Sequence, residues 1–242
     1  NKKQHKPFFL ACGFSKPHLP WFVPKKYFDL HPLDKIILPK TRDDDRDDLP
    51  AFGKKLAREA HDVSGAQNFA EQGEDHEMVL NHNQWPRAVQ SYLATISFVD
   101  HQVGRLLQAL KNSPYVTNTI VVLWGDHGWH LGEKGHWHKR TLWEEATRVP
   151  FIISAPGTGR AGQRCAQPVS LVDIFPTLIE LCNLPPIRNL DGISLVPWLQ
   201  DPAKSRQTPA LTIEESGHVS LRTCLLYTSD AADEEDSVDL GG

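Results

Sequence analysis

The apolar residues of the chain follow two periods, and each predicts a different kind of element. Between Trp85 and Lys111 they recur every three or four positions, which is typical of an amphipathic helix packing on a sheet. Short apolar runs at 119–124 and 149–154 predict buried strands that turn residues end. A helix followed by a strand is the order of a βαβ unit, so we expect an α/β fold with a largely parallel mixed sheet flanked by helices.

The remaining segments have weaker patterns. Residues 7–14 predict a strand, and residues 15–52 a proline-rich, irregular stretch. The acidic run at 41–48 lacks the glycine and the distal glutamate of an EF-hand loop, so a solvated turn is favoured over a calcium loop. Residues 170–182 have helical spacing, and Pro176 is a potential kink in that helix.

The apolar run at 119–124 stops abruptly at an adjacent carboxylate and imidazole, Asp126 and His127, and a glycine-punctuated loop follows. In open α/β sheets, ligands bind just beyond the carboxyl ends of the strands. Asp126 and His127 therefore lie where a metal ion or an anion would be held. Hard cations such as Ca²⁺ prefer carboxylate oxygens, whereas a histidine nitrogen also suits a softer metal.

The stretch from Gly125 to Lys139 resembles the second metal-binding block of type I sulfatases, in particular the iduronate-2-sulfatase-like branch. Residues 7–20 resemble the strand and loop that carry an active-site histidine in that family. Residues 147–153 and 172–178 resemble the strand and helix that follow. The resemblance implies an incomplete alkaline phosphatase-like sulfatase fold, with residues 1–221 as the C-terminal part of the catalytic domain.

The same resemblance implies roles for individual residues. Asp126 and His127 would be ligands of one divalent cation, Ca²⁺. Lys139 would bind the sulfate and neutralise its charge, and His18 would donate a proton to the leaving group, a task that suits imidazole near neutral pH. The substrate pocket would be lined by Lys16, Trp129 and His130. The alternative for each is an ordinary polar or buried residue.

Histidines at 130, 136 and 138 raise the alternative of a separate zinc site. His136 and His138 would share one face of an extended segment. Calcium-type chemistry needs no such cluster, and these positions are outside the ligand set that the resemblance implies. A zinc site is therefore the less favoured interpretation.

The chain has no Cys-x-Pro-Ser-Arg motif, from which the resembled family makes its formylglycine nucleophile. Cys12 lies near the N-terminus but lacks the proline and the arginine, so a small buried apolar residue is favoured. The chain also begins at Asn1. We therefore interpret it as a fragment, inactive alone, of an enzyme whose formylglycine lies in a missing N-terminal part. A formylglycine-generating enzyme would then be a partner of the full-length parent.

Composition narrows the class of protein. The chain has 242 residues and a net charge of −4, which gives no basic face for nucleic acid, and no apolar stretch approaches the ~20 residues of a membrane span. Its four cysteines show no disulfide pattern.

The resemblance implies a periplasmic, extracellular or lysosome-like location. Residues 222–242 form an acidic tail outside the family pattern, which we expect to be non-native or disordered.

These observations predict a metal-dependent sulfuric ester hydrolase that acts on a sulfated saccharide. One alternative is a phosphodiesterase or phosphonate hydrolase of the same superfamily, which would carry more metal-binding histidines and a threonine or serine nucleophile. The other is a non-catalytic sulfoglycan-binding homologue, which would keep His18 and Lys139 but lack any nucleophile.

Overall fold

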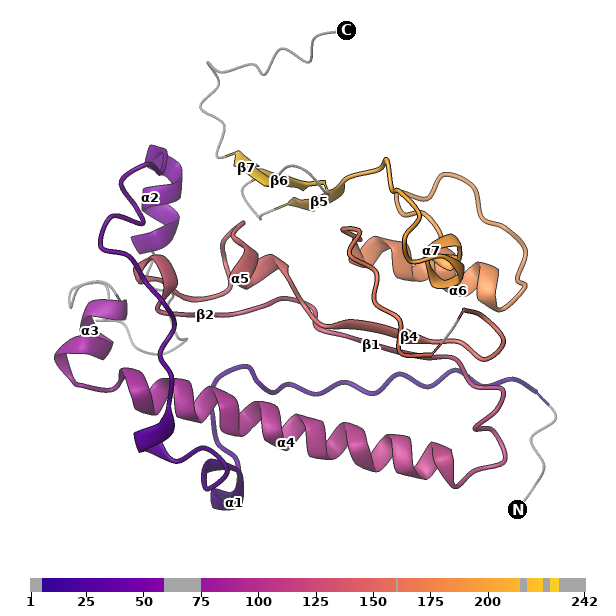
Figure 1. Cartoon of the computed structure of the whole chain (residues 1–242), viewed down its shortest axis with the longest axis horizontal. Helices are drawn as coiled ribbons and strands as arrows, with labels where there is room; N and C mark the ends of the chain where they lie inside the picture. The colour runs from indigo at the N-terminus through magenta and orange to yellow at the C-terminus, as the bar shows by residue number, and fades with distance from the viewer. Residues whose placement is uncertain (1–5, 59–74, 160, 214–216, 224–226, 231–242) are drawn as a thin grey trace, which may run out of the picture. The chain divides into compact units, whose positions relative to one another are not determined.

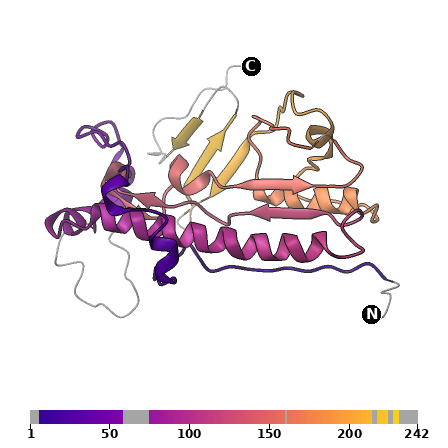
Figure 2. The same cartoon turned by 60° about the horizontal axis from the view of Figure 1, so that its bottom comes forward.

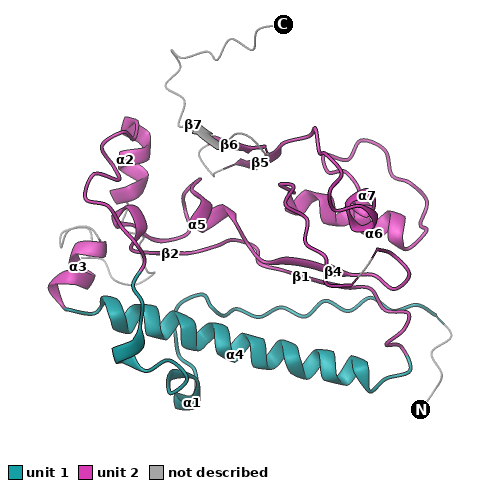
Figure 3. Cartoon of the chain, viewed as in Figure 1, with its two compact units in different colours: residues 1–38, 83–114 teal, residues 39–82, 115–242 magenta. Residues whose placement is uncertain are grey.

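The computed structural model describes residues 6–58, 75–159, 161–213, 217–223 and 227–230 (Figure 1). The chain divides into two compact units, which Figure 3 colours separately. Unit 1 comprises residues 1–38 and 83–114, and unit 2 comprises residues 39–82 and 115–242. Of the helices in the described ranges, none is long and apolar enough to cross a membrane.

Unit 1 is built on the long helix α4, Trp85–Lys111, whose bounds match the range predicted from the apolar spacing. Its proline lies in the first turn, where no helical hydrogen bond is lost. Helix α1 (Lys25–Phe28) and the 3₁₀ turn η1 (Leu33–Lys35) pack against α4. The buried ring of Tyr27 meets the rings of Phe98 and His101 edge-on, which fixes α1 on the helix.

The N-terminal stretch of unit 1 differs from its prediction. Residues 7–14 form no strand in the described structure, and the side chains of Phe9 and Leu10 are 86% and 73% exposed. An apolar run becomes a strand only when a neighbouring strand supplies hydrogen-bond partners, and no such ladder is described here. The expectation that Cys12 is buried was also wrong, because this residue is exposed.

Unit 2 contains both strands predicted from apolar runs, as β1 (Val121–Trp124) and β4 (Phe151–Ser154). They pair antiparallel, with Val121 opposite Ser154 and Trp124 opposite Phe151. A parallel pair would need a long crossover connection, usually a helix. The chain between β1 and β4 instead folds back through β2 (His130–Leu131), the turn η3 (Glu133–Gly135), β3 (Trp137–His138) and the short helix α5 (Glu144–Thr147).

All strand pairs in the described ranges are antiparallel. The α/β class of the prediction holds, whereas its largely parallel pairing is not seen among these strands. The third sheet consists of β5 (Ala210–Ile213), β6 (Val219–Arg222) and β7 (Tyr227–Asp230), and Figure 2 shows its strands next to one another. Strand β7 lies within the range predicted as a tail, and residues 231–242 lie outside the described residues. The proposed boundary at 222 stays a prediction.

The helices of unit 2 are short. They are α2 (Ala51–Arg58), α3 (Asp75–Asn81), α5, η4 (Leu171–Asp173), α6 (Ile174–Leu181) and α7 (Val196–Gln200). The pair η4 and α6 confirms the helix predicted at 170–182, and Pro176 falls in the first turn of α6, where a proline does not break a helix. A buried cluster of Leu56, Ala57 and Trp143 joins α2 to the segment before α5.

The C-terminal part of unit 2 is organised around the carboxylate of Asp173. This group accepts hydrogen bonds from the backbone N–H groups of Ser170 and Ile193, at 3.0 and 2.9 Å, and from the guanidinium of Arg206 at 2.8 Å. The side chains of Asp173 and Arg206 are each 2% exposed. A buried charge is tolerated only when it is paired and hydrogen-bonded, and the carboxylate of Asp173 meets both conditions.

Candidate active site

The loop that follows β1 is held at both ends by backbone hydrogen bonds. The N–H of Gly125 donates to the carbonyl of Pro150 at 3.0 Å, and the N–H of Gly128 donates to Ala146 at 2.7 Å. A Cβ atom on Gly128 would collide with the carbonyl oxygen of Glu145, so only glycine fits this close approach. The two residues between the glycines are therefore carried on a fixed backbone.

Those two residues are Asp126 and His127, the predicted metal ligands. The Nδ1 of His127 lies 2.8 Å from the carbonyl oxygen of Gly128, so that nitrogen carries the proton and donates it. Its Nε2 then presents a lone pair, and it lies 3.6 Å from Oδ2 of Asp126. A carbonyl that fixes the tautomer in this way is typical of metal-binding histidines.

The geometry of this pair fits a divalent cation. Two neighbouring ligands at calcium distances, seen at a right angle from the ion, are about 3.4 Å apart, close to the observed separation. The side chain of Asp126 is 86% exposed and that of His127 is 26% exposed, so a solute can reach both. No cluster of three or more potential ligands forms among the described residues. The pair thus offers two of the six to eight ligands that calcium takes.

Lys139 returns to the same end of the hairpin as this loop. Strands β2 and β3 are antiparallel, and His130 lies opposite His138. The residue before β2 and the residue after β3, Trp129 and Lys139, therefore lie at one end of the hairpin. The rings of Trp129 and His138 meet edge-on at 5.2 Å, which agrees with this placement. The backbone of Lys139 thus lies at the end of the hairpin that the loop with Asp126 and His127 precedes, and its place in one site with them stays a prediction.

Trp129 is largely buried, with 8% of its surface exposed, and its ring stacks on that of His127 at 6.2 Å. The Trp129 ring therefore packs against the imidazole of His127 and is mostly shielded from solvent. Packing of an aromatic ring against the imidazole restricts its rotation, which supports the orientation that the bond to Gly128 sets.

The structure corrects the prediction for His130, which was expected to line the substrate pocket. Its side chain has no exposed surface, and its Nε2 lies 2.8 Å from the hydroxyl of Thr141. Burial lowers the pKa of this imidazole to about 3, so the ring is neutral at ordinary pH. His130 belongs to the interior of the hairpin.

The three histidines of the zinc alternative are directed to different partners. The rings of His130 and His136 meet edge-on at 5.0 Å, and both pack against Trp143. His138 instead faces the carboxylate of Asp75, at 3.2 Å. The described structure therefore does not assemble these imidazoles around a common point, and the zinc alternative loses its support.

The acidic run at 41–48 forms a turn, as predicted, and part of it is used by the hairpin. Asp45 pairs with Lys134 at 2.8 Å, with side chains 31% and 20% exposed, and the ammonium of Lys134 also lies over the ring of Trp143. Arg42 pairs with Asp44 at the surface and lowers the pKa of that carboxyl by its hydrogen bond. Lys134 is therefore an anchor of the hairpin and not a solvated surface lysine.

The two remaining candidates, Lys16 and His18, lie in unit 1. Their loop is stabilised by local hydrogen bonds: Lys16 Nζ donates to the carbonyl of Pro20 at 2.5 Å, and the N–H of His18 donates to Ser15 at 3.0 Å. The imidazole of His18 is exposed and its Nδ1 lies 2.9 Å from the carbonyl of Leu19. Their participation in one site with the residues of unit 2 stays a prediction.

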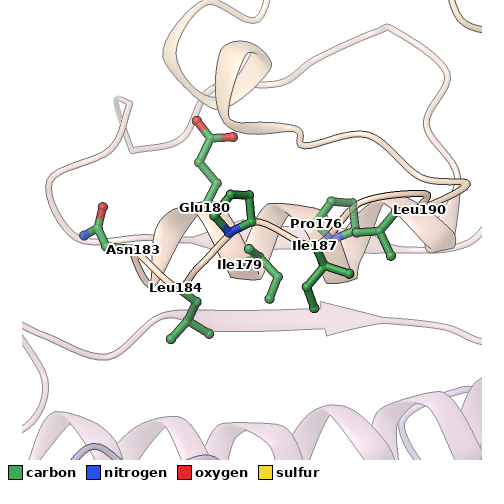
Figure 4. Close-up of a pocket in the computed structure, with 8 residues that line it drawn as sticks. Pro176, Ile179, Glu180, Asn183, Leu184, Ile187 and Leu190 are labelled. Atoms are coloured by element: carbon green, nitrogen blue, oxygen red, sulfur yellow. The ribbon is translucent and has the colours of Figure 1, made fainter.

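A hollow of about 540 Å³ lies elsewhere in unit 2, along α6 and the loop after it (Figure 4). Its lining is mostly apolar, and Glu180 and Asn183 supply the polar groups. None of the predicted site residues lines it. We therefore do not assign the hollow to the candidate site.

Comparison with known proteins identifies the family. Residues 1–184 match the family model described as Sulfatase. The chain belongs to the sulfatase family. A sulfatase of Formosa agariphila is 42% identical over 88% of this chain, and the iduronate 2-sulfatase of Mus musculus is 34% identical over 76% of it. The matched regions cover 39% and 37% of those relatives, so this sulfatase chain spans less than two fifths of their length.

Solved structures agree with the fold expected of a sulfatase. The phosphonate monoester hydrolase of Agrobacterium radiobacter aligns with a TM-score of 0.68 at 24% identity, covering 91% of this chain and 48% of that protein. BT4656, solved with its substrate D-glucosamine-2-N,6-O-disulfate, aligns with a TM-score of 0.64 at 22% identity, covering 86% and 53%. The chain thus has the alkaline phosphatase-like α/β fold of sulfatases, present in part.

Sequence reasoning missed one residue that the structure places beside the site. Asp75, at the start of α3, contacts His138 next to Lys139. It lies in the polar, weakly periodic region 53–83, where no pattern distinguishes it from other acidic residues.

Proposed function

We propose that this chain carries the metal-binding and sulfate-binding part of a sulfuric ester hydrolase that acts on sulfated carbohydrate, in the manner of iduronate-2-sulfatase-like enzymes. The observation that carries the proposal is the exposed pair of Asp126 and His127 on a fixed loop, with Lys139 at the same end of the hairpin. The family membership supports it, as does a structural neighbour whose substrate is a sulfated glucosamine.

Each residue would contribute a distinct part of the reaction. Asp126 and His127 would hold one divalent cation, which when bound supplies a Lewis acid next to the sulfuryl oxygens. The ammonium of Lys139 would neutralise negative charge on the transferred group. When the bond between sulfur and the leaving oxygen breaks, that oxygen needs a proton, and the imidazole of His18 would donate it.

The proposal assigns the nucleophile to a part of the enzyme outside this chain. None of the four cysteines lies in a Cys-x-Pro-Ser-Arg motif. The formylglycine would therefore belong to a longer parent protein and require a formylglycine-generating enzyme, and this fragment would be inactive alone. From the family membership we also propose a periplasmic, extracellular or lysosome-like location.

Substrate contacts are proposed for Lys16 and for the small part of Trp129 that is exposed, 8% of its surface. His130 takes a supporting role instead, because its side chain has no exposed surface. An aromatic edge beside a cation site suits a saccharide ring, which presents both apolar C–H groups and hydroxyls.

The test requires the full-length enzyme, matured by a formylglycine-generating enzyme. Sulfate release from sulfated saccharides would be measured with and without a chelator, beside Asp126→Ala and a control, Arg140→Ala, at an exposed position near Lys139. We expect chelator-sensitive release that Asp126→Ala lowers about 10²–10³-fold and Arg140→Ala retains. Turnover of a phosphonate monoester in place of sulfate release would show the phosphonate hydrolase alternative. Saccharide binding without any turnover would show the non-catalytic homologue.

A further inference from the structure

The backbone of His138 is held in an uncommon conformation. Its φ is +75°, in the left-handed region that residues other than glycine rarely adopt. Such a conformation is energetically costly and persists only where the surroundings enforce it. His138 nevertheless belongs to β3 and is paired with His130 across the hairpin.

The surroundings of the His138 side chain supply that enforcement. Its Nε2 lies 3.2 Å from Oδ2 of Asp75, so the imidazole is in ion-pair contact with the carboxylate. The two side chains are 17% and 19% exposed, so the contact is largely shielded from competing water. The imidazole also meets the ring of Trp129 edge-on at 5.2 Å. The imidazole is thus held between α3 and the residue before β2.

The next residue along the chain is Lys139. Its backbone is also fixed by the residues that follow it. The N–H of Thr141 donates to the carbonyl oxygen of Lys139 at 2.7 Å. A lysine side chain is long and flexible, and it loses much rotamer entropy when fully ordered. Fixing the backbone that carries it restricts the directions in which the ammonium can extend.

We propose that Asp75 and His138 form a positioning pair, which sets the direction of Lys139 toward the sulfate ester of the substrate. The pair touches no reacting atom and acts through the lysine. This inference rests on the proposed function of Lys139. It accounts for a strained residue at the position directly before the predicted sulfate-binding group.

The structure also provides a matched control. Helix α3 makes a second side-chain contact with β3, in which the indole N–H of Trp137 donates to Nδ1 of His76 at 3.2 Å. His76 follows Asp75 directly and also attaches α3 to β3, but its printed contact is with Trp137 and not with His138. Loss of this second contact would weaken the attachment of α3 without releasing the imidazole of His138.

The experiment measures kcat and KM of the matured full-length enzyme on a sulfated saccharide, for single and combined variants. We expect His138→Ala and Asp75→Ala each to lower kcat about 10- to 100-fold with little change in KM, as misplacement of a group that acts in the transition state does. His138→Gln, which keeps an N–H donor, should recover most of the lost kcat. His76→Ala should change kcat less than about 3-fold.

A double-variant comparison separates positioning from an independent role. If His138 acts only through Lys139, His138→Ala combined with Lys139→Ala should be no slower than Lys139→Ala alone. A further multiplicative loss would overturn the proposal, and so would a loss from His76→Ala equal to that from His138→Ala. A normal kcat for Lys139→Ala would instead refute the proposed function. If His138→Ala does not fold, the same comparison is made with Asp75→Ala, which reaches the pair from α3.

Discussion

Two aspartates of unit 2 have opposite surroundings. The side chain of Asp173 is 2% exposed, and its oxygens accept hydrogen bonds from two backbone N–H groups and the guanidinium of Arg206. The side chain of Asp126 is 86% exposed and has the imidazole of His127 3.6 Å away. The carboxylate of Asp173 stabilises the fold, whereas the carboxylate of Asp126 faces solvent, where a cation or substrate can reach it.

The difference extends to the backbone around each residue. Near Asp173 the side chain fixes the backbone, because its oxygens accept hydrogen bonds from backbone N–H groups of two separate segments. Near Asp126 the backbone orders the side chain, because bonds from Gly125 and Gly128 fix the loop that carries it. Substitution of the first aspartate should therefore cost stability, and substitution of the second should cost activity.

The largest effect on stability should come from Asp173→Ala. Removing one partner of a buried ion pair leaves the other charge without compensation, which typically costs about 3–5 kcal/mol. The free energy of unfolding, from urea denaturation, would be compared with that of Asp29→Ala. This control breaks an exposed pair with Lys25, in which the side chains are 54% and 85% exposed, and should cost less than about 1 kcal/mol. Equal losses in the two variants would contradict the structural role of Asp173.

Asp126→Ala should show the reverse behaviour. We expect the free energy of unfolding to change by less than about 0.5 kcal/mol, as for other exposed positions. Loss of one charged group that organises the transition state typically lowers turnover by about 10²–10³-fold. Urea denaturation and sulfate release, measured on the same full-length variant, would check both statements. A destabilised variant with retained turnover would place Asp126 with Asp173 as a structural residue.

Sequence periodicity was sufficient to predict the positions of helices and strands whose apolar pattern is local. The 27 residues of α4 cover many helical turns, so the apolar spacing defines both ends of the helix. The apolar runs likewise located β1 and β4. Their antiparallel pairing was not predictable in the same way, because a strand pattern shows burial but not the neighbouring strand. For the same reason the apolar run at 7–14 was taken for a strand.

The candidate site was predictable as far as its motif extends along the chain. Asp126, His127 and Lys139 share one segment, and the hairpin brings them toward one end. The environment of each histidine was not predictable, because a buried His130 and a reachable His127 look alike in sequence. The contact between Asp75 and His138 joins segments far apart in the chain, and only tertiary packing reveals it.

Gly128→Ala should lower stability by a smaller amount and disturb the site directly. The added Cβ would meet the carbonyl oxygen of Glu145, which is backbone and cannot move aside cheaply. Such overpacking typically costs about 1–3 kcal/mol. Gly104→Ala is the matched control, because nothing lies within 4 Å of its Cβ position in α4 and alanine favours a helix. We expect urea denaturation to show a loss for the first variant and a gain of up to about 1 kcal/mol for the second.

A pH dependence of stability should arise from His130. Burial lowers the pKa of this imidazole from 6.5 to about 3, and the titratable side chains near it are those of His136 and Lys134. Above pH 6.5 the ring is neutral in the folded and unfolded chain, so its contribution to stability is complete. As the pH falls from 6.5 toward 3, only the unfolded chain takes up the proton, and stability decreases by up to about 1.4 kcal/mol per pH unit.

Burial raises the pKa of Glu133, and this shift affects stability in the opposite direction. The folded chain binds that proton more readily than the unfolded chain, so stability increases as the pH falls. The measurement is therefore a difference between the protein and His130→Gln, because the contribution of Glu133 is common to both. His130→Gln keeps a polar contact to Thr141 but cannot titrate. Its stability deficit at pH 7 should shrink as the pH falls from 6.5 to 5. Parallel curves for the two proteins would show that His130 is reached by solvent, which would return it to the substrate side of the hairpin beside Asp126.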